Sequence, residues 1–257
     1  MRKKWVIANW KMNGEALFIK EWAQSAEAFE RYISADLKIV ICPSFPYLGM
    51  LKQSFLNHKA ASLWVGAQNV SEQLSGAFTG EVSASMLVDA GVQAAIIGHS
   101  ERRHIYHETN ELIAQKVEVA LSHHLTPILC IGETLDQRES GVTYQVLKGQ
   151  LAPVINLIGT QLFSQIIIAY EPVWAIGTGK TATPELAEET HADIRKILAE
   201  YDLVLASQMS ILYGGSLKPD NAADLFSQPN IDGGLVGGAS LLPCDFLAIV
   251  NAFNVVH

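Results

Sequence analysis

A carboxylate that closes an apolar run is the first candidate for chemistry in this sequence. Glu171 directly follows the run Ile166–Tyr170, where a charged side chain has little structural use. Pro172 restricts Glu171 to extended backbone geometry and removes one backbone donor. A carboxylate held in this way at the end of a buried strand is hard to explain as structure, so Glu171 is a candidate functional residue.

A histidine follows another apolar run. His99 comes directly after Ala94–Gly98, and the next residues, Ser100 and Glu101, suit the first turn of a helix. The positive end of the helix dipole favours the neutral imidazole, which can donate a hydrogen bond to a carbonyl oxygen without carrying full charge. A single histidine in such a place is more often structural than catalytic, so both interpretations stay open.

A lysine lies just beyond the first apolar run. The segment Asn9–Gly14 reads Asn-Trp-Lys-Met-Asn-Gly and brings Lys11 to the end of a buried strand. A charge there is costly unless it has a partner or a function. A lysine that extends to the rim is equally compatible with the sequence. Glu101 is either the ion-pair partner of Lys11 or a plain acid at the start of a helix.

Two further residues lie in or near these segments. Arg103 is compatible with an ion pair behind the site and equally with a solvated arginine at the surface. Cys130 follows Pro127–Leu129, and this apolar setting favours an inert, buried thiol close to the site.

Pairs of glycines follow the last two apolar runs. Gly214 and Gly215 precede Ser216, and Gly237 is followed by Gly238. Paired glycines let the backbone approach a ligand and direct amide N–H groups towards it. Either pair alone is compatible with an ordinary tight turn. Because barrels often bind phosphate after their last two strands, the two pairs together favour a phosphate site.

The segment after the carboxylate has the composition of a cover for the site. Apolar Val173, Trp174 and Ile176 lead into Gly177 and Gly179. An ordinary surface loop is the plain alternative, but a solvated loop rarely carries tryptophan and isoleucine at its tip. The pattern therefore favours a lid that moves as a unit.

The elements that must position these residues alternate regularly along the chain. Short β-branched runs without strict alternation predict strands that are buried on both faces, as in a parallel sheet. These runs are Val6–Asn9, Lys38–Cys42, Leu63–Ala67, Ala94–Gly98, Pro127–Ile131, Ile166–Tyr170, Ser210–Tyr213 and Gly234–Val236. The longer amphipathic segments between them predict helices, among them Ala16–Ile33, Leu112–Leu121, Tyr144–Ile158 and a helix from Thr183 to Tyr201.

The number and spacing of these runs indicate the fold. Eight runs in 257 residues correspond to about 32 residues for each unit, the size of a βα repeat. No linker or change of composition divides the chain. We therefore expect an α/β protein with one domain over residues 1–257, a (β/α)8 barrel whose functional residues lie at the C-terminal ends of the strands.

The composition argues against several classes of protein. Hydrophobic residues make up 49% and charged residues 17%, which excludes disorder of the whole chain. The net charge of −8 argues against nucleic acid and anionic membranes as partners, since both bind basic patches. The 3 separated cysteines and the short apolar stretch Trp5–Ala8 predict a soluble, cytoplasmic protein without a secretory signal.

Taken in order, these segments resemble the triosephosphate isomerase family over essentially the whole chain. The segments that carry the resemblance are Asn9–Gly14, Gly98–Arg103, Ala169–Gly179, Tyr213–Ser216 and Leu235–Ser240. The third is the most specific, because it joins the carboxylate to the lid. The sequence does not depart from the family pattern at a catalytic position.

The resemblance implies a reaction and a role for each residue. The reaction is the interconversion of dihydroxyacetone phosphate and D-glyceraldehyde 3-phosphate through an enediolate, with no cofactor and no metal. Glu171 would move the proton between adjacent carbons, and His99 would donate a hydrogen bond to the developing oxyanion. Lys11 would supply fixed positive charge and Asn9 a further donor. Amide groups would bind the phosphate near Gly177, Ser216, Gly237 and Gly238.

The resemblance also implies a homodimer. Gly66–Asn69 and Gly76–Glu81 look like segments with which the family builds its subunit contact. Thr79 is the residue that would reach towards the lysine and the histidine of the partner subunit. Nothing in the residues themselves indicates association.

Three other functions fit these residues less well. A Schiff-base aldolase requires a lysine at the end of a central strand, where this chain offers Cys130, Glu171 and Tyr213. A non-catalytic binding or scaffold protein has little use for a lysine, a histidine and a carboxylate at strand ends together with both glycine pairs. A metal-dependent epimerase requires clustered ligands. The local histidine pairs fit exposed helix surface better: His104 with His107, and His123 with His124.

Overall fold

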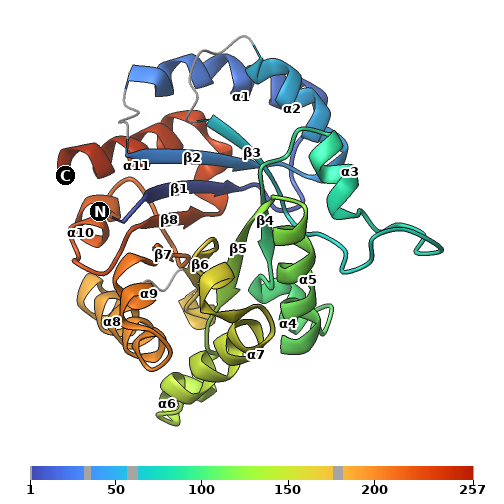
Figure 1. The fold of residues 1–257 in the computed structure, drawn as a ribbon. Coiled ribbons are helices and arrows are strands. Elements are labelled where there is room, and N and C mark those ends of the chain that lie inside the picture. The colour runs from blue at the N-terminus through green and yellow to red at the C-terminus, as the bar shows by residue number, and fades with distance from the viewer. Residues whose placement is uncertain (1, 32–35, 57–62, 176–181, 257) are drawn as a thin grey trace.

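The fold is built around a closed barrel of parallel strands. The computed structural model describes residues 2–31, 36–56, 63–175 and 182–256. Each strand pairs with the next along the chain, and the last pairs with the first (Figure 1). The strands are β1 (Lys4–Asn9), β2 (Leu37–Cys42), β3 (Leu63–Ala67), β4 (Ala94–Ile97), β5 (Thr126–Ile131), β6 (Ile167–Tyr170), β7 (Ile211–Tyr213) and β8 (Gly233–Val236). The predicted (β/α)8 barrel is confirmed, and each predicted run corresponds to a strand whose bounds agree within two residues.

Helices surround the barrel in the connections between strands (Figure 1). The α-helices of the described chain are α1 (Ala16–Ser25), α2 (Leu48–Phe55), α3 (Ala84–Asp89), α4 (Ser100–His104), α5 (Asn110–Ser122), α6 (Leu135–Glu139), α7 (Thr143–Phe163), α8 (Pro184–Ala199), α9 (Leu203–Gln208), α10 (Ala222–Phe226) and α11 (Pro243–Val256). Short 3-10 segments are η1 (Ala26–Arg31), η2 (Phe45–Tyr47), η3 (Val173–Ala175) and η4 (Gly238–Leu241). Within these described helices, none combines the length and the hydropathy of a membrane span.

The alternation of side chains along each strand creates two separate cores. In β2, Ile39 and Ile41 belong to the core between the strands and the helices, whereas Val40 and Cys42 belong to the core inside the barrel. Successive side chains of a strand point to opposite faces, so both faces of β2 are apolar. This arrangement explains why the runs in the sequence show no alternation between polar and apolar residues.

Helix α8 begins where the sequence predicts. The Thr183 hydroxyl accepts a hydrogen bond from the amide of Leu186, and Pro184 occupies the first turn. The helix buries His191, Ile194 and other residues of one face against the barrel and ends at Ala199, two residues before the predicted end.

Two predicted helices differ from the structure in detail. The segment predicted as one helix from Ala16 is α-helical only to Ser25 and continues as a 3-10 segment, because the amide of Ala26 bonds to the carbonyl of Ala23. Its predicted end, Ile33, lies outside the described residues. In α7, Gly159 leaves the helical conformation at φ +75°, so the regular part ends at the predicted position.

Candidate active site

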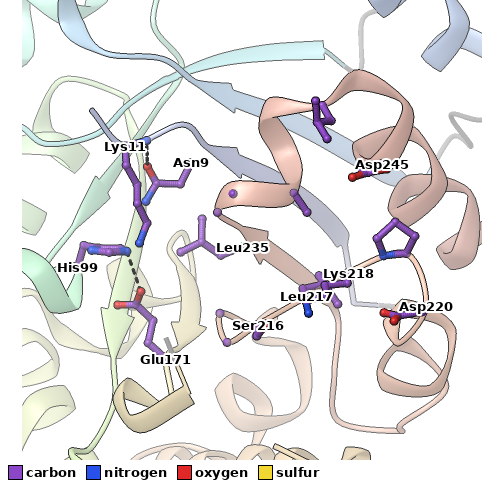
Figure 2. A pocket seen from close by; sticks show the side chains of 17 residues that line it. Asn9, Lys11, His99, Glu171, Ser216, Leu217, Lys218, Asp220, Leu235 and Asp245 are labelled. Carbon is purple, nitrogen blue, oxygen red and sulfur yellow. Dashed lines mark hydrogen bonds and ion pairs between the residues drawn. The ribbon is translucent and has the colours of Figure 1, made fainter. Parts of the chain in front are cut away.

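A cavity of about 700 Å³ opens at the C-terminal ends of the strands (Figure 2). Because all strands are parallel and pair in chain order, the residues that follow them meet at one end of the barrel. The residues that line the cavity include predicted ones from β1, β4, β6, β7 and β8, namely Asn9, Lys11, His99, Glu171, Ser216, Gly237 and Gly238.

Glu171 lies at the end of β6 with its carboxylate in the cavity (Figure 2). One carboxylate oxygen is 2.9 Å from Nε2 of His99. The other accepts a hydrogen bond from the backbone amide of Ser100 at 2.9 Å. Burial raises the pKa of Glu171, but the His99 ring and the Ser100 amide stabilise the carboxylate and hold its pKa below the ordinary value. The group is therefore ionised at neutral pH.

Two glycines make room for the backbone and the side chain of Glu171. A Cβ atom at Gly132, directly after β5, would lie 1.8 Å from the backbone oxygen of Glu171. A Cβ atom at Gly214, after β7, would lie 2.9 Å from Cγ of Glu171. The role of Gly132 was not predicted, because the requirement comes from a close approach between strands that are far apart in the sequence.

His99 carries its proton on the ring nitrogen that faces Glu171. It precedes α4, and its Nδ1 accepts a hydrogen bond from the backbone amide of Glu101 at 3.2 Å. Burial is the largest influence on the pKa of His99 and lowers it, but the charge and hydrogen bond of Glu171 together with the charge of Glu101 raise the pKa above the ordinary value. The amide of Glu101 nevertheless occupies the nitrogen where an imidazolium would need its second proton. We therefore assign the neutral ring with hydrogen on Nε2, the form that the sequence favours.

Lys11 is held at the rim of the same cavity by its backbone and by its side chain. Its φ of +52° lies in the left-handed region, and its amide donates to the side-chain oxygen of Asn9 at 3.0 Å (Figure 2). Its ammonium is 2.8 Å from a carboxylate oxygen of Glu101, which is the first of the two alternatives that the sequence left open. The cation is thus directed into the site by groups of β1 and α4.

The two glycine-rich turns face the cavity with unused amide groups. Among the described residues, the amides of Ser216, Gly237 and Gly238 meet no hydrogen-bond acceptor. The carbonyl of Gly237 is occupied by the amide and the hydroxyl of Ser240 at 2.8 and 2.7 Å. The Ser216 carbonyl accepts from the side chain of Asn221. Donors that lack a protein acceptor suit an anion such as a phosphate.

The start of the predicted lid is anchored by an acid that was not predicted. Val173–Ala175 forms η3, and the indole N–H of Trp174 donates to Glu133 at 3.0 Å. The hydroxyl of Tyr170 donates to the same buried carboxylate oxygen at 3.0 Å. Glu133 lies two residues after β5. Its position just after a predicted strand, like that of Glu171, is the signal in the sequence that could have identified it. Gly177 and the rest of the lid lie outside the described residues.

Arg103 differs from both roles proposed for it from the sequence. Its guanidinium donates to the carbonyls of Gly98 at 2.7 Å and Cys130 at 2.9 Å, and to the side chain of Asn110 at 2.7 Å. Arg103 therefore forms no ion pair among the described residues, and its guanidinium is not a solvated surface group. Its hydrogen bonds instead connect the ends of β4 and β5. Cys130 is buried, as predicted, and this burial raises the pKa of its thiol well above the usual value.

The remaining candidates lie away from the cavity. Thr79 is exposed in the segment between β3 and α3. His104, His107 and His124 are exposed as well, whereas His123 is half-buried. Only His104 lies in a helix, so the prediction that both histidine pairs lie on helix surface was wrong for the other three. Over the described part of the chain, no group of three or more histidine, cysteine, aspartate or glutamate residues is placed to hold a metal ion.

Comparisons with known proteins agree on one family. The model of a family described as triosephosphate isomerase matches residues 4–253. A triosephosphate isomerase of Xanthomonas campestris pv. campestris (strain 8004) is 51% identical over 252 residues, which cover 98% of this chain and 98% of that protein. A triosephosphate isomerase of Stenotrophomonas maltophilia (strain K279a) is 50% identical with the same coverage of both chains.

Proposed function

The chain belongs to the triosephosphate isomerase family, and on this basis we propose how its own residues carry out the reaction. The protein is an isomerase that interconverts dihydroxyacetone phosphate and D-glyceraldehyde 3-phosphate, a step of glycolysis and gluconeogenesis. The observation that supports our assignment of residues best is the pair of Glu171 and the neutral His99, 2.9 Å apart in a cavity that also contains Lys11.

Glu171 is the base in this proposal. It removes a proton from the carbon next to the carbonyl group, and the electrons of the C–H bond form the enediolate. It then returns the proton to the neighbouring carbon. Its lowered pKa supports this role, because the carboxylate is already ionised when the substrate arrives.

His99 and two residues of β1 and the following turn stabilise the charge that develops on oxygen. The Nε2–H group of His99 donates a hydrogen bond to the enediolate oxygen and relays protons between the two oxygen atoms. Lys11 supplies fixed positive charge, and the amide nitrogen of Asn9 is a further donor. Donors that are already in place where charge develops lower the barrier without reorganisation.

The phosphate group is bound by backbone amides in this proposal. The free amides of Ser216, Gly237 and Gly238 support the assignment, and we add Gly177 by analogy with the family pattern. The mechanism uses no cofactor and no metal. The lid beyond Val173 excludes water, which protects the enediolate from losing its phosphate before reprotonation.

We further propose that the protein is a homodimer in which Thr79 reaches the Lys11 and His99 of the partner subunit. Large apolar side chains are exposed near these residues: Met12 beside Lys11, Leu74 and Phe78 in the Thr79 segment, Met86 in α3, and Ile105 and Tyr106 after α4. Exposed apolar groups of this size are typical of an interface. The proposal also treats residues 1–257 as one domain and places the protein in the cytoplasm, where its 3 free cysteines stay reduced.

An assay of isomerase activity on wild type and Glu171→Gln tests this proposal. Glutamine keeps the size of the side chain but cannot accept the proton, so we expect kcat to fall by roughly 10²–10⁴-fold. Glu118→Gln on the exposed surface of α5 is the matched control and should keep wild-type activity. Full activity of Glu171→Gln in a folded protein would contradict the assignment of the base.

A further inference from the structure

Lys11 has a backbone conformation that its surroundings must maintain. Its φ of +52° is in the left-handed region, which a side chain with a Cβ atom rarely adopts. A residue of this kind keeps such a conformation only when neighbouring groups hold it. Because the direction of the side chain depends on φ, the position of the ammonium in the cavity depends on what holds the peptide groups of Lys11.

Side chains from three neighbouring strand ends hold these peptide groups. The amide N–H of Lys11 donates to Asn9 at 3.0 Å. The carbonyl oxygen accepts a hydrogen bond from the side-chain amide of Gln68 at 2.8 Å and another from the hydroxyl of Ser44 at 2.9 Å. Both lone pairs of this carbonyl are therefore used, and the donors come from the segments that follow β2 and β3.

The hydroxyl of Ser44 donates a hydrogen bond to Lys11 and does not cap the 3-10 segment that follows Ser44. Ser44 directly precedes the 3-10 segment η2 (Phe45–Tyr47), where a serine side chain commonly caps the free amides. Its side chain makes no capping hydrogen bond there. The hydroxyl has a single proton and lies 2.9 Å from the carbonyl of Lys11 but 3.4 Å from that of Asn13, so the bond to Lys11 is the stronger one.

We propose that Ser44 is a positioning residue for the isomerase reaction, which acts by holding Lys11 in its left-handed conformation. Ser44 does not line the cavity and acts only through Lys11. The inference therefore rests on the role proposed above for Lys11. Gln68 shares the same carbonyl, but it also donates to the carbonyl of Cys42 at 2.9 Å. Loss of Gln68 would thus disturb two strand ends, whereas loss of the Ser44 hydroxyl removes one bond.

The position of Lys11 is linked to substrate affinity. Without the Ser44 bond, a fraction of the molecules relaxes to an ordinary φ with the ammonium turned out of the cavity. The anionic substrate binds the molecules that keep the left-handed conformation, and its binding shifts the others back to that conformation. The apparent affinity is therefore reduced in proportion to the fraction of molecules in that conformation, while bound complexes react as before. A general loss of folded protein has the opposite signature, because it lowers the maximal rate and leaves KM unchanged.

Steady-state kinetics of Ser44→Ala with glyceraldehyde 3-phosphate test the proposal. We expect KM to rise roughly two- to tenfold, the effect of one lost hydrogen bond, with kcat within about twofold of wild type. Ser54→Ala is the matched control, since its hydroxyl donates to the Met50 carbonyl within α2, away from Lys11. Ser44→Thr keeps a hydroxyl at the same place and should have the KM of the wild type.

The possible outcomes separate this inference from the proposed function. A wild-type KM in Ser44→Ala, or a KM in Ser44→Thr raised as much as in the alanine variant, would overturn the role of Ser44. A lower kcat with unchanged KM would also overturn it, because that result indicates structural damage. Lys11→Ala tests the premise separately. Full activity of that variant would instead overturn the role of Lys11.

Discussion

Glu171 and His99 are both buried, and each determines the protonation of the other. The His99 ring and the Ser100 amide lower the pKa of Glu171, while Glu171 raises the pKa of His99. A donor at Nδ1, the amide of Glu101, then selects the neutral ring. Neighbouring groups a few ångströms away thus keep Glu171 ionised and leave His99 as a hydrogen-bond donor through Nε2.

A second buried histidine gives a prediction on stability. His191 of α8 packs between the rings of Tyr170 and Tyr213, and its Nδ1 lies 2.7 Å from the carbonyl of Ala187. Burial lowers its pKa to about 4, whereas an unfolded histidine titrates near 6.5. The unfolded state therefore binds more protons between these pH values, so the stabilisation from neutral His191 is complete above about pH 6.5 and is lost as the pH falls towards 4.

This loss should reach about 2 kcal/mol at pH 5. Urea unfolding at pH 7 and pH 5 measures it, and His191→Gln provides the comparison. The variant should lose less stability than the wild type between the two pH values. Equal losses would show that His191 does not titrate in this range.

At the scale of elements, the site depends on how closely β5 and β6 approach at their C-terminal ends. The amide of Glu171 donates to the carbonyl of Ile131 at 2.7 Å, and the next residue on that side is Gly132. The missing side chain at Gly132 leaves the space that the backbone of Glu171 occupies. The position of the Glu171 backbone therefore depends on the glycine that follows the neighbouring strand.

Gly132→Ala should damage both stability and activity. The added Cβ atom, 1.8 Å from the Glu171 oxygen, forces the two strand ends apart. We expect a loss of about 1–3 kcal/mol in the free energy of unfolding and a fall in kcat of roughly 10²-fold from the displaced base. Thermal unfolding and the isomerase assay measure the two effects.

Gly149→Ala is the matched control for this prediction. Gly149 lies inside α7, and a Cβ atom there meets no other atom within 4 Å. Alanine should stabilise the helix by about 0.5–1 kcal/mol and leave activity unchanged. Similar effects of the two variants would show that the approach of β5 and β6 is unimportant.

At the scale of the whole molecule, exposed apolar residues lie in the segments that follow β1, β3 and β4. Met12 is 96% exposed although it is the neighbour of Lys11, and Phe78 is 45% exposed beside Thr79. These segments either belong to the site or connect to it, so the proposed association and the proposed catalysis are expected to be coupled.

Phe78→Asp should separate the subunits. A charge in a buried interface is costly, so we expect the molar mass from analytical ultracentrifugation to fall to that of one chain. Activity should fall by roughly 10²-fold as Thr79 leaves the partner subunit. Leu203→Asp in α9, at a residue that is 76% exposed, is the control and should leave mass and activity unchanged. A wild-type protein with the mass of a single chain would contradict the dimer.

The sequence by itself determined the barrel and most of the residues around its cavity. Eight buried runs predicted the strands, and in a parallel barrel the residues that follow strands must meet at one end. Asn9, His99 and Glu171 were identifiable for this reason, as polar groups directly at the ends of such runs. The pairing of Lys11 with Glu101 was one of two alternatives that followed from the same argument.

Only the tertiary structure decided the groups that hold those residues in place. Arg103 bonds to the carbonyls of Gly98 and Cys130, and Ser44 bonds to the carbonyl of Lys11. Partners of this kind are backbone groups from other strand ends, and a backbone carbonyl has no signature in the sequence. Close approaches such as that of Gly132 to Glu171 have the same origin, because they depend on the distance between strands and not on residue type.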